Sequence, residues 1–406
     1  MQRESARPGV ARRPESGQFR RAMRLLALFP ALLALIGACY LVAAAWLVAR
    51  FARAGAQAGE GAATPPGITV LKPLHGAEAG LEASLVSTVE QAYAGPYQVL
   101  FGVRDAADPA AAVVRRIIAE RPGRDLELVV DPSVRGTNYK IANLENMASR
   151  ATHPILVIAD SDISVGPTWA EEVTRPLEDQ AVGLVTCLYR GRPAWGLYPM
   201  LGAMFVNYAF LPSAILGEKL DPGRGCFGAT MALRRATLDA VGGLAPFRDL
   251  LADDYALGEA VRRTGSRVVL SRTLVDTAVT EPTVGELWRH ELRWQRTIRL
   301  LSPKGFAGSI VTHPLALSLL AALLSLFALP YLVLFLLILA LRVATARAID
   351  RAIWLAPAPL WAWPIRDSLS FAVFVASFCG RKIAWRGRAF RLARDGRLVA
   401  DGDHST

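Results

Sequence analysis

Two carboxylates that follow a short apolar run are well suited to binding a metal ion. Ile155–Ala159 holds five consecutive apolar residues and leads directly into Asp160, Ser161 and Asp162. A short run rich in β-branched residues predicts a buried strand of a parallel sheet. Ligands of open α/β sheets bind beyond the carboxyl ends of strands, and carboxylates suit a hard divalent cation with the phosphates it carries. The sequence therefore predicts a metal and nucleotide site here; the alternative is a strand that meets solvent through an acidic turn.

Two further acidic positions are placed to face the same crevice. Asp105 ends a predicted strand at Tyr97–Val103, and Asp253-Asp254 come directly before a helical stretch at Tyr255–Arg263. A carboxylate beside a bound hydroxyl can accept its proton as a general base, which is the role we expect for Asp254. The alternatives are structural: Asp105 is a turn residue, and Asp253 is the N-cap of the helix.

A fourth element combines a cationic and an aromatic side chain. The segment HELRW (residues 290–294) lies in a predicted helix over Gly285–Leu300. The guanidinium of Arg293 matches phosphate oxygens, and Trp294 offers a flat face to a sugar or an apolar molecule. The alternative is an amphipathic helix beside a membrane, with arginines that extend to the membrane surface.

The elements that position these residues alternate between strands and helices. Repeated βα units whose strands end in polar residues predict a doubly wound α/β domain over residues 67–304. The Gly-x-Gly-x-x-Gly sequence GRGCFG (223–228) does not follow any of the predicted strands, and no Walker sequence occurs, so neither a dinucleotide nor a P-loop site is supported. We expect strands at 67–71, 97–103, 126–130 and 155–159, and helices at 78–92, 109–120, 139–149, 255–263 and 285–300.

The N-terminal part predicts a membrane anchor. Leu25–Ala49 has 25 residues without a charge, enough for one bilayer-crossing helix. The run is longer than the apolar core of a signal peptide, so we interpret residues 25–50 as a retained anchor. Residues 1–24 are predicted to be a disordered basic tail, and residues 51–66, rich in Gly, Ala and Pro, a linker.

A second uncharged segment, Pro193–Gly217, resembles a membrane span in hydropathy only. It contains glycine and proline residues that a lipid-exposed helix rarely carries. A single crossing there would also place Asp254 and Asp160 on opposite sides of the membrane. We therefore expect a segment that dips into the membrane, with ordinary core helices as the alternative.

The last third of the chain is apolar at first and basic at its end. Residues 305–341 predict one tilted span or two short spans broken near Pro330. Residues 352–364 and 368–380 are apolar pieces separated by Arg366-Asp367, and they predict one broken span or interfacial helices. We assign residues 305–380 to membrane helices and residues 381–406 to a basic tail.

The composition fits a membrane protein better than a nucleic-acid-binding protein. Hydrophobic residues make up 52% of the 406 residues. The net charge of +11 comes mainly from arginines in the two tails, which suit an anionic membrane surface, and no RNA- or DNA-binding motif accompanies them. No C-x-x-C pair occurs among Cys39, Cys187, Cys226 and Cys379, so we expect neither a disulfide framework nor a zinc site. We expect the catalytic part to lie in a reducing compartment.

Taken in order, these motifs resemble a known family. An Asp that ends an early strand, an Asp-x-Asp, a later Asp-Asp and an Arg-Trp helix before membrane segments are together similar to membrane-bound inverting glycosyltransferases of the GT-A fold. Finer likenesses, over about residues 25–395, are to the ceramide glucosyltransferase family, glycosyltransferase family 2/21. They lie in LKPL (71–74), VRD (103–105) with Asp108-Pro109, NYKIANL (138–144), Asp160-Ser161, ADDY (252–255) and WRGR (385–388).

Within this group the chain is most similar to bacterial hopanoid-biosynthesis-associated glycosyltransferases. That likeness lies in TCLYRGRP (186–193) and WRHELRW (288–294). It implies transfer of one hexose, N-acetylglucosamine or glucose, from a UDP-sugar to a hydroxyl of a membrane lipid, either a hopanoid polyol or ceramide. The reaction implied is a direct displacement at the anomeric carbon with inversion.

The resemblance also implies a role for each motif. The expected roles are Lys72 and Asp105 at the uracil and ribose, Lys140 in the donor site, Asp160 and Asp162 on Mg²⁺ or Mn²⁺ at the diphosphate, Asp254 as base, and Arg293 with Trp294 closing the site. His290 is expected among the catalytic residues, and its role stays open.

Two positions depart from the family pattern. The family helix usually begins with Gln or Arg, whereas this chain has His290, which speaks against a phosphate contact there. Asp162 completes an Asp-x-Asp that ceramide enzymes often lack, which favours metal ligation.

The implied location is a bacterial inner membrane, crossed more than once, with the catalytic domain in the cytoplasm where UDP-sugars occur. The seven arginines among residues 1–24 would then lie outside, against the positive-inside tendency. We therefore expect translation to begin at Met23, which leaves only Arg24 before the anchor. The alternatives are a processive polysaccharide synthase and a non-catalytic membrane scaffold; no nucleic-acid partner is expected, and the oligomeric state stays open.

Overall fold

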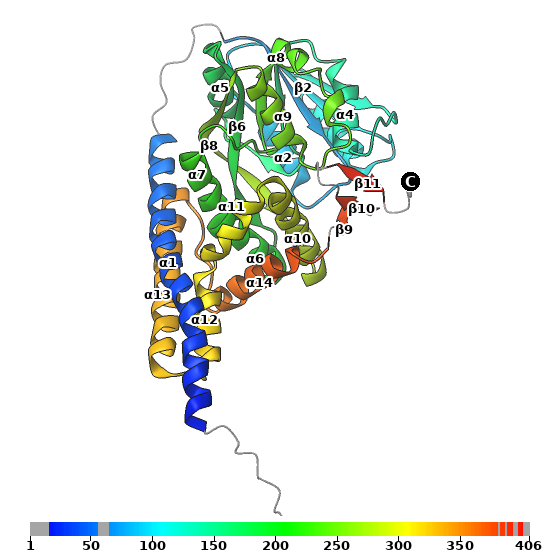
Figure 1. The fold of residues 1–406 in the computed structure, drawn as a ribbon. Helices are drawn as coiled ribbons and strands as arrows, with labels where there is room; N and C mark the ends of the chain where they lie inside the picture. Colours follow the sequence, from blue (N-terminus) through cyan, green and yellow to red (C-terminus); the bar gives the residue numbers. More distant parts are fainter. Residues whose placement is uncertain (1–15, 56–64, 381, 386–387, 393–396, 401–406) are drawn as a thin grey trace, which may run out of the picture.

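The computed structural model describes residues 16–55, 65–380, 382–385, 388–392 and 397–400. A twisted sheet with helices on both faces lies beside a group of long helices, and a small second sheet lies near the C-terminus (Figure 1). The strands are β1 (Ile68–Pro73), β2 (Tyr97–Val103), β3 (Asp125–Val130), β4 (Ile155–Ile158), β5 (Ile163–Ser164), β6 (Val182–Pro193), β7 (Met231–Arg234), β8 (Arg267–Val279), β9 (Lys382–Trp385), β10 (Arg388–Leu392) and β11 (Leu398–Ala400). The α-helices are α1 (Ser16–Gly55), α2 (Leu81–Val89), α3 (Pro109–Glu120), α4 (Tyr139–Ala148), α5 (Trp169–Thr174), α6 (Leu197–Phe205), α7 (Leu211–Leu220), α8 (Arg235–Ala240), α9 (Asp253–Arg263), α10 (Val284–Leu301), α11 (Pro303–Gly308), α12 (Pro314–Leu324), α13 (Leu329–Ile353) and α14 (Ala362–Ser377).

The large sheet is mixed, with the order β3-β2-β1-β4-β7-β6-β8-β5. Strands β1 to β4 are parallel, whereas β7 is antiparallel to both β4 and β6. The predicted α/β class is confirmed, but β4 has one parallel and one antiparallel neighbour rather than two parallel ones. The reason is that the chain enters β7 at the edge where β4 ends, with Met231 opposite Ile158. The loop before β7 therefore crosses the carboxyl end of β4.

Local capping explains why several predicted elements are confirmed. Helix α3 begins at Pro109 because the side chain of Asp108 accepts a hydrogen bond from the backbone of Ala110. Helix α4 begins after Asn138, whose side-chain oxygen accepts from the backbone of Lys140. This cap places Lys140 in the first turn of α4, at the carboxyl edge of the sheet.

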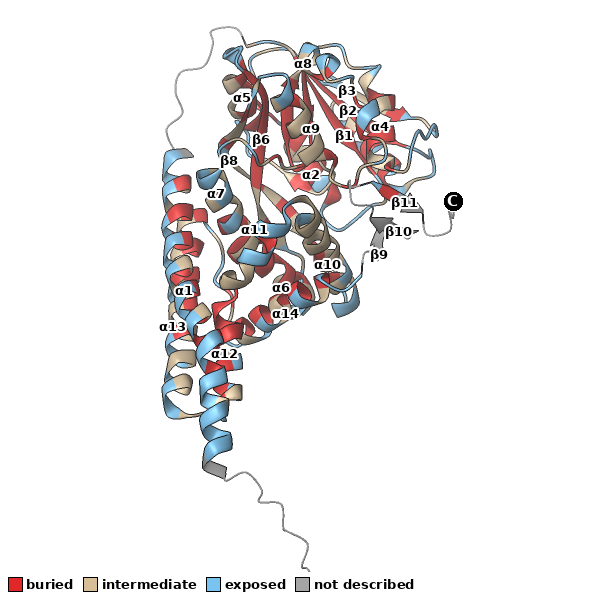
Figure 2. Ribbon diagram, viewed as in Figure 1, coloured by how far each residue is buried: buried red, intermediate tan, exposed pale blue. Residues whose placement is uncertain are grey.

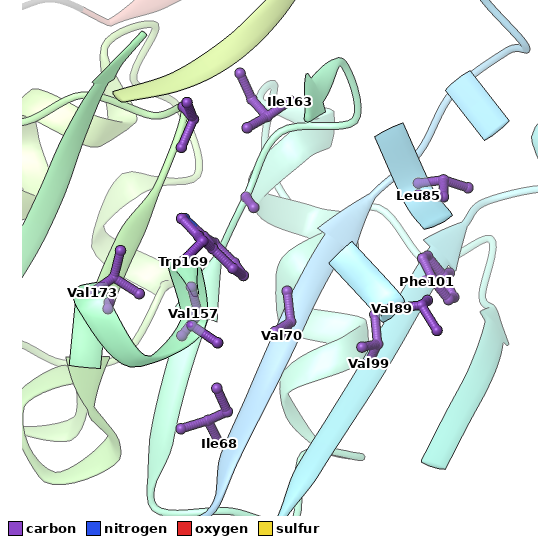
Figure 3. Packing of buried hydrophobic residues seen from close by; sticks show 14 of the residues in the cluster. Ile68, Val70, Leu85, Val89, Val99, Phe101, Val157, Ile163, Trp169 and Val173 are labelled. Carbon is purple, nitrogen blue, oxygen red and sulfur yellow. The ribbon is translucent and has the colours of Figure 1, made fainter. Parts of the chain in front are cut away.

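The sheet is buried on both faces, which explains the uninterrupted apolar run of β4. Val70 and Val157 point to one face, where Trp169 of α5 and Leu85 of α2 cover them (Figure 3). A second cluster covers the other face, and its members include Leu71, Leu100, Ile141, Leu144, Leu156 and Leu257.

Among the described residues, three helices are long and apolar enough to cross a membrane. They are Gln18–Ala54, Leu197–Leu220 and Leu329–Ile353, and a bent pair, Pro303–Thr312 with Pro314–Leu324, could form a fourth. Helix α1 begins at Ser16, so the end of the predicted disordered tail is helical; no proline interrupts the chain between Pro14 and Pro30. Much of its N-terminal half is exposed (Figure 2).

The two apolar segments after residue 305 differ in how they match the prediction. Helices α12 and α13 are separated at residues 325–328, which confirms two helices broken near Pro330. Arg366-Asp367, in contrast, do not separate two pieces but lie inside the single helix α14. They are tolerated there because both side chains turn into the protein, where Arg366 meets Glu291 and Asp367 meets Arg342.

The segment from α6 to α7 is mostly buried. It runs through a π-helical turn at Val206–Phe210 and packs against β6 and α1. The side chain of Asn207 pairs with the backbone of Gly191 in β6, with bonds of 2.8 and 2.9 Å. This burial is what the alternative of ordinary core helices requires.

The small C-terminal sheet rests on the loop before α9. Strand β10 pairs antiparallel with β9 and β11, and Phe390 and Leu398 pack on Leu251. Arg386 and Gly387 of the WRGR segment lie outside the described residues.

Candidate active site

Charged side chains from three elements meet around Gly228, in the loop before β7. Lys140 comes from the first turn of α4, Asp160 follows β4, and Asp254 lies in the first turn of α9. A Cβ atom on Gly228 would lie 3.1 Å from Lys140 Nζ and 3.3 Å from a carboxylate oxygen of each aspartate. A side chain at this position would have to move these groups by a few tenths of an ångström, so the loop packs closely against them.

Lys140 neutralises much of the acidic charge. Its Nζ lies 2.7 Å from Asp160 Oδ1 and 3.5 Å from Asp253 Oδ2. Burial alone would lower the pKa of Lys140, but Asp160, Asp253 and Asp254 outweigh this effect and raise the pKa above its ordinary value. Lys140 is therefore a fixed ammonium ion in the centre of the site.

Asp254 is held by two backbone amides. Its Oδ2 accepts from the Gly228 N–H and its Oδ1 from the Tyr255 N–H, both at 2.8 Å. Burial and then the adjacent Asp253 raise the pKa of Asp254 from 3.8 to about 6, while Lys140 opposes the shift. A carboxylate with such a pKa is suited to accept a proton near neutral pH.

Asp162 and Lys72 form the neighbouring part of the site. Thr277 donates to Asp162 Oδ2 at 2.5 Å, and burial together with Asp160 raises the pKa of Asp162. The buried Lys72 donates from Nζ to the Ile163 carbonyl at 2.9 Å. Burial lowers the pKa of Lys72 to about 8, although Asp162 and Asp160 counteract it. Both predicted residues therefore lie within the electrostatic field of Asp160.

Asp105 lies at the same sheet edge but in an exposed turn. Strand β2, which it follows, is the neighbour of β1, and its Oδ1 accepts from the Ala107 N–H at 2.9 Å. The adjacent Arg104 stacks over the ring of Tyr139, 4.3 Å from its centroid. The bond to Ala107 is what the alternative interpretation of Asp105, a turn residue, requires.

Asp253 is not the N-cap of α9. Ala252 occupies that position, and Asp253 is the first helical residue. Its buried carboxylate lies against Lys140 and 3.4 Å from the side-chain amide of Asn138. The cap alternative is therefore wrong, because the carboxylate points at α4 rather than at its own helix.

Trp294 of α10 lies in a group of aromatic rings. Its ring centroid is 5.8 Å from Phe210, 6.1 Å from Phe205 and 6.4 Å from Tyr189. Phe205 and Phe210 come from the α6–α7 segment, so this segment forms the surroundings of Trp294.

His290 packs edge-on against Trp294, with centroids 4.8 Å apart, and its Nδ1 pairs with the carboxylate of Glu281. Glu281 thus engages one of the two ring nitrogens of His290. Arg293 lies within electrostatic range of Glu281 and Tyr189.

Tyr189 links the acidic group to α10. Burial and then Asp254, Asp162 and Asp160 raise the pKa of Tyr189 well above its ordinary value, while Arg293 lowers it. Its ring also stacks on Phe210 at 4.8 Å.

Sequence reasoning missed Tyr189, Gly228, Asp253 and Thr277 as site residues. Tyr189 lies inside the TCLYRGRP segment, which carried a signal of family likeness but none of chemistry. Gly228 lies in a loop whose approach to Asp160 depends on the antiparallel course of β7.

Among the residues that the structure describes, no three His, Cys, Asp or Glu side chains are grouped to hold a metal ion. The candidate metal ligands in this part of the chain are therefore the pair of carboxylates of Asp160 and Asp162. Mg²⁺ sites commonly use one or two carboxylates and complete the shell with substrate phosphates and water.

Comparison with known proteins identifies the chain's relatives. A model of glycosyl transferase family 21 matches residues 29–398. Ceramide glucosyltransferase 1 of Caenorhabditis elegans is 23% identical over 349 residues, covering 82% of this chain and 73% of that protein. Ceramide glucosyltransferase 3 of the same organism is 22% identical over 353 residues, covering 82% and 74%.

Among solved structures, a mannosyltransferase from Pyrobaculum calidifontis in complex with GDP-Man and Mn²⁺ is 21% identical, with a TM-score of 0.48, covering 86% of this chain and 99% of that chain. S. aureus TarS in complex with UDP-GlcNAc is 12% identical, with a TM-score of 0.38, covering 83% and 99%. Because the family model spans most of the sequence, including every site residue described above, the chain belongs to glycosyl transferase family 21 and is a ceramide-glucosyltransferase-like glycosyltransferase.

Proposed function

We propose that this enzyme transfers one hexose, glucose or N-acetylglucosamine, from a UDP-sugar to a hydroxyl group of a membrane lipid, a ceramide or a hopanoid polyol. The observation that carries the proposal is the convergence of Lys140, Asp160 and Asp254 on Gly228 at the carboxyl edge of the sheet. One ammonium group and several carboxylates at this edge suit a donor that brings both a diphosphate and a reacting sugar. The names of the worm relatives support ceramide and glucose.

The donor would lie across the ends of β1, β2 and β4. Lys72 and Asp105 would contact the uracil and ribose, and Lys140 would contact the diphosphate. Asp160 and Asp162 would hold Mg²⁺ or Mn²⁺. Their fit is supported by the raised pKa of Asp162, which reflects burial and repulsion by Asp160 and which a cation between them would relieve. When bound, the metal would offset negative charge on the diphosphate.

Asp254 would act as the general base. Its carboxylate would take the proton of the acceptor hydroxyl while that oxygen forms a bond to the anomeric carbon. The bond from the anomeric carbon to the diphosphate oxygen breaks in the same step, UDP departs, and the configuration inverts. Arg293 would pair with phosphate oxygens of the departing UDP, and Trp294, with His290 beside it, would cover the sugar or the apolar part of the acceptor.

Contact with a membrane is supported by the inverted polarity of α14. Its exposed positions Ile365, Ser368, Ala372 and Val375, and Trp361 just before the helix, carry no charge, whereas Arg366 is 1% exposed. A helix in water would show the opposite pattern. Exposed tryptophans at an interface are typical of membrane surfaces, and Trp195 and Trp354 are also exposed.

We propose that residues 25–50 and 305–380 belong to the membrane part and that residues 67–304 face the cytoplasm of a bacterial cell as the GT-A domain. The lipid acceptor would then reach the site from the side of α10 and α14. Helix α10 and helix α14 lie side by side below the sheet (Figure 1), which supports this route.

The test is a product analysis. Membranes containing the protein are incubated with labelled UDP-glucose or UDP-N-acetylglucosamine and with ceramide or a hopanoid polyol. A labelled lipid with one sugar is the expected result, and its identity fixes donor and acceptor. A labelled polymer would favour the processive polysaccharide synthase, and no labelled product from any pair would contradict the proposal.

A further inference from the structure

One face of α10 has an unusual composition. Of its 18 residues, the buried ones are Leu287 and Glu291, one turn apart. Glu291 is 3% exposed, and a buried carboxylate without a partner would be strongly unfavourable. The position of this helix therefore depends on what meets Glu291.

Arg366 of α14 meets it with a bidentate pair. Nη1 and Nη2 donate to the two carboxylate oxygens of Glu291, each at 2.7 Å. Nη1 also donates to the Leu201 carbonyl at 3.0 Å, and Nη2 and Nε donate to Ser370 Oγ at 2.8 and 3.1 Å. All five N–H groups of the guanidinium thus have acceptors, an arrangement that lysine cannot reproduce.

The Glu291 partner of Arg366 lies on the same helix, α10, as the cationic and aromatic side chains of the site. Glu291 is adjacent to His290 and precedes Arg293 and Trp294 on the same helix. Arg366 also lies over the ring of Phe205, 5.7 Å from its centroid, and Phe205 packs on Trp294. Arg366 therefore holds both α10 and α6, the two helices that orient Trp294.

We propose that Arg366 is a positioning residue for sugar transfer: through Glu291 it fixes the rotation and height of α10, so that Arg293 and Trp294 face the carboxylates around Gly228. The inference rests on the proposed function and extends it to α14, whose opposite face carries the uncharged stripe. The helix that lies against the lipid would thus also set the geometry of the site. Donor binding at Asp160 and Lys72 should not depend on it, because those residues belong to the sheet edge.

The structure offers a matched control. Arg342 and Asp367 form a second bidentate pair, with bonds of 2.9 and 3.1 Å, and both side chains are also buried. This pair joins α13 to α14 and does not reach α10. Weakening it disturbs the same helix layer by the same chemistry without releasing Glu291.

Four variants of the full-length protein are compared in detergent micelles. They are Arg366→Lys, Glu291→Gln, the double variant that carries both changes, and the control Asp367→Asn. We expect kcat for transfer to fall about 10- to 100-fold in Arg366→Lys and Glu291→Gln, because small displacements of positioning groups have effects of this size. The KM for the UDP-sugar should change less than kcat, because the contacts of Asp160 and Lys72 at the sheet edge remain. The double variant should lose no more than the single variants, since both break one pair. Asp367→Asn should keep kcat per folded molecule.

A second readout does not depend on activity. Hydrogen–deuterium exchange of the α10 backbone amides should become faster in Arg366→Lys and Glu291→Gln but not in Asp367→Asn. If wild-type protein transfers no sugar, the proposed function fails while this exchange result still decides on the positioning role. Unchanged kcat, equal loss of kcat in Asp367→Asn, multiplicative losses in the double variant, or unchanged exchange in α10 would each overturn the inference. Glu291→Gln retains the test if Arg366→Lys does not fold.

Discussion

The two charged regions of the molecule are built in opposite ways. In the helices α10, α13 and α14, Arg366 with Glu291 and Arg342 with Asp367 are buried, bidentate and mutually satisfied. At the carboxyl edge of the sheet, Lys140 faces the carboxylates of Asp160, Asp253 and Asp254, and burial raises the pKa of Asp254 to about 6.

The difference suggests that the first region fixes the positions of helices and the second takes part in binding and chemistry. Fully paired buried charges fix the position of helices, and removing one partner is costly. Carboxylates that are crowded and incompletely paired have shifted pKa values, which are typical of sites where ligands or protons are exchanged. The first region is therefore expected to respond to mutation in stability and geometry, and the second in chemistry and binding.

The largest effect should come from Asp254→Asn. Loss of the proposed base should lower sugar transfer by about 10³-fold or more, while UDP binding survives because the amide keeps the shape of the side chain. The measurement is the initial rate of labelled lipid formation together with UDP affinity. Retained turnover would remove Asp254 as the base.

A large effect on stability, without a matching effect on chemistry, is expected for Asp367→Asn. The change leaves Arg342 buried without its counter-charge, which should lower the free energy of unfolding by about 3–5 kcal/mol. Thermal unfolding of the purified protein in detergent micelles would show it. An unchanged melting temperature would mean that the paired region does not hold the helices as inferred.

An intermediate effect on binding is expected for Asp160→Ala. With one of two carboxylates gone, UDP affinity in the presence of Mg²⁺ or Mn²⁺ should weaken about 10- to 100-fold, while UDP binding without metal should change less. Titration calorimetry with and without the metal distinguishes the two. Equal affinities in wild type and variant under both conditions would exclude ligation by Asp160.

The smallest effect, and the finest test of the comparison, is the pH dependence of transfer. Because the pKa of Asp254 is raised, from 3.8 to about 6, the base is ionised above that pH and protonated below it. The rate should therefore rise about tenfold per pH unit up to about pH 6 and level off above it. A profile that levels off already near pH 4 would show that Asp254 has an ordinary pKa.

The candidate site residues were easier to predict from the sequence than the arrangement of the helices and strands around them. Asp160, Asp162 and Asp254 could be predicted because strand ends and helix starts are local features, marked by an apolar run or by the first turn of a helix. The start of α3 was predictable for the same reason, since Asp108 and Pro109 are neighbours in the chain.

Other features depend on contacts between distant parts of the chain. Arg366 and Glu291 are 75 residues apart, and read alone Arg366-Asp367 looks like a break in an apolar segment. The approach of Gly228 to Asp160 likewise follows from the antiparallel course of β7, which a parallel pattern of βα units does not predict. Pairing of charges across helices leaves no periodic signal in either partner.

The anomeric configuration of the lipid product tests the site most directly. The sugar of UDP-glucose and of UDP-N-acetylglucosamine is α-linked, so a single displacement with Asp254 as base yields a β-linked glycolipid. Proton NMR of the purified product distinguishes the two linkages. We predict the β-anomer, and an α-linked product would contradict a single displacement with Asp254 as its base.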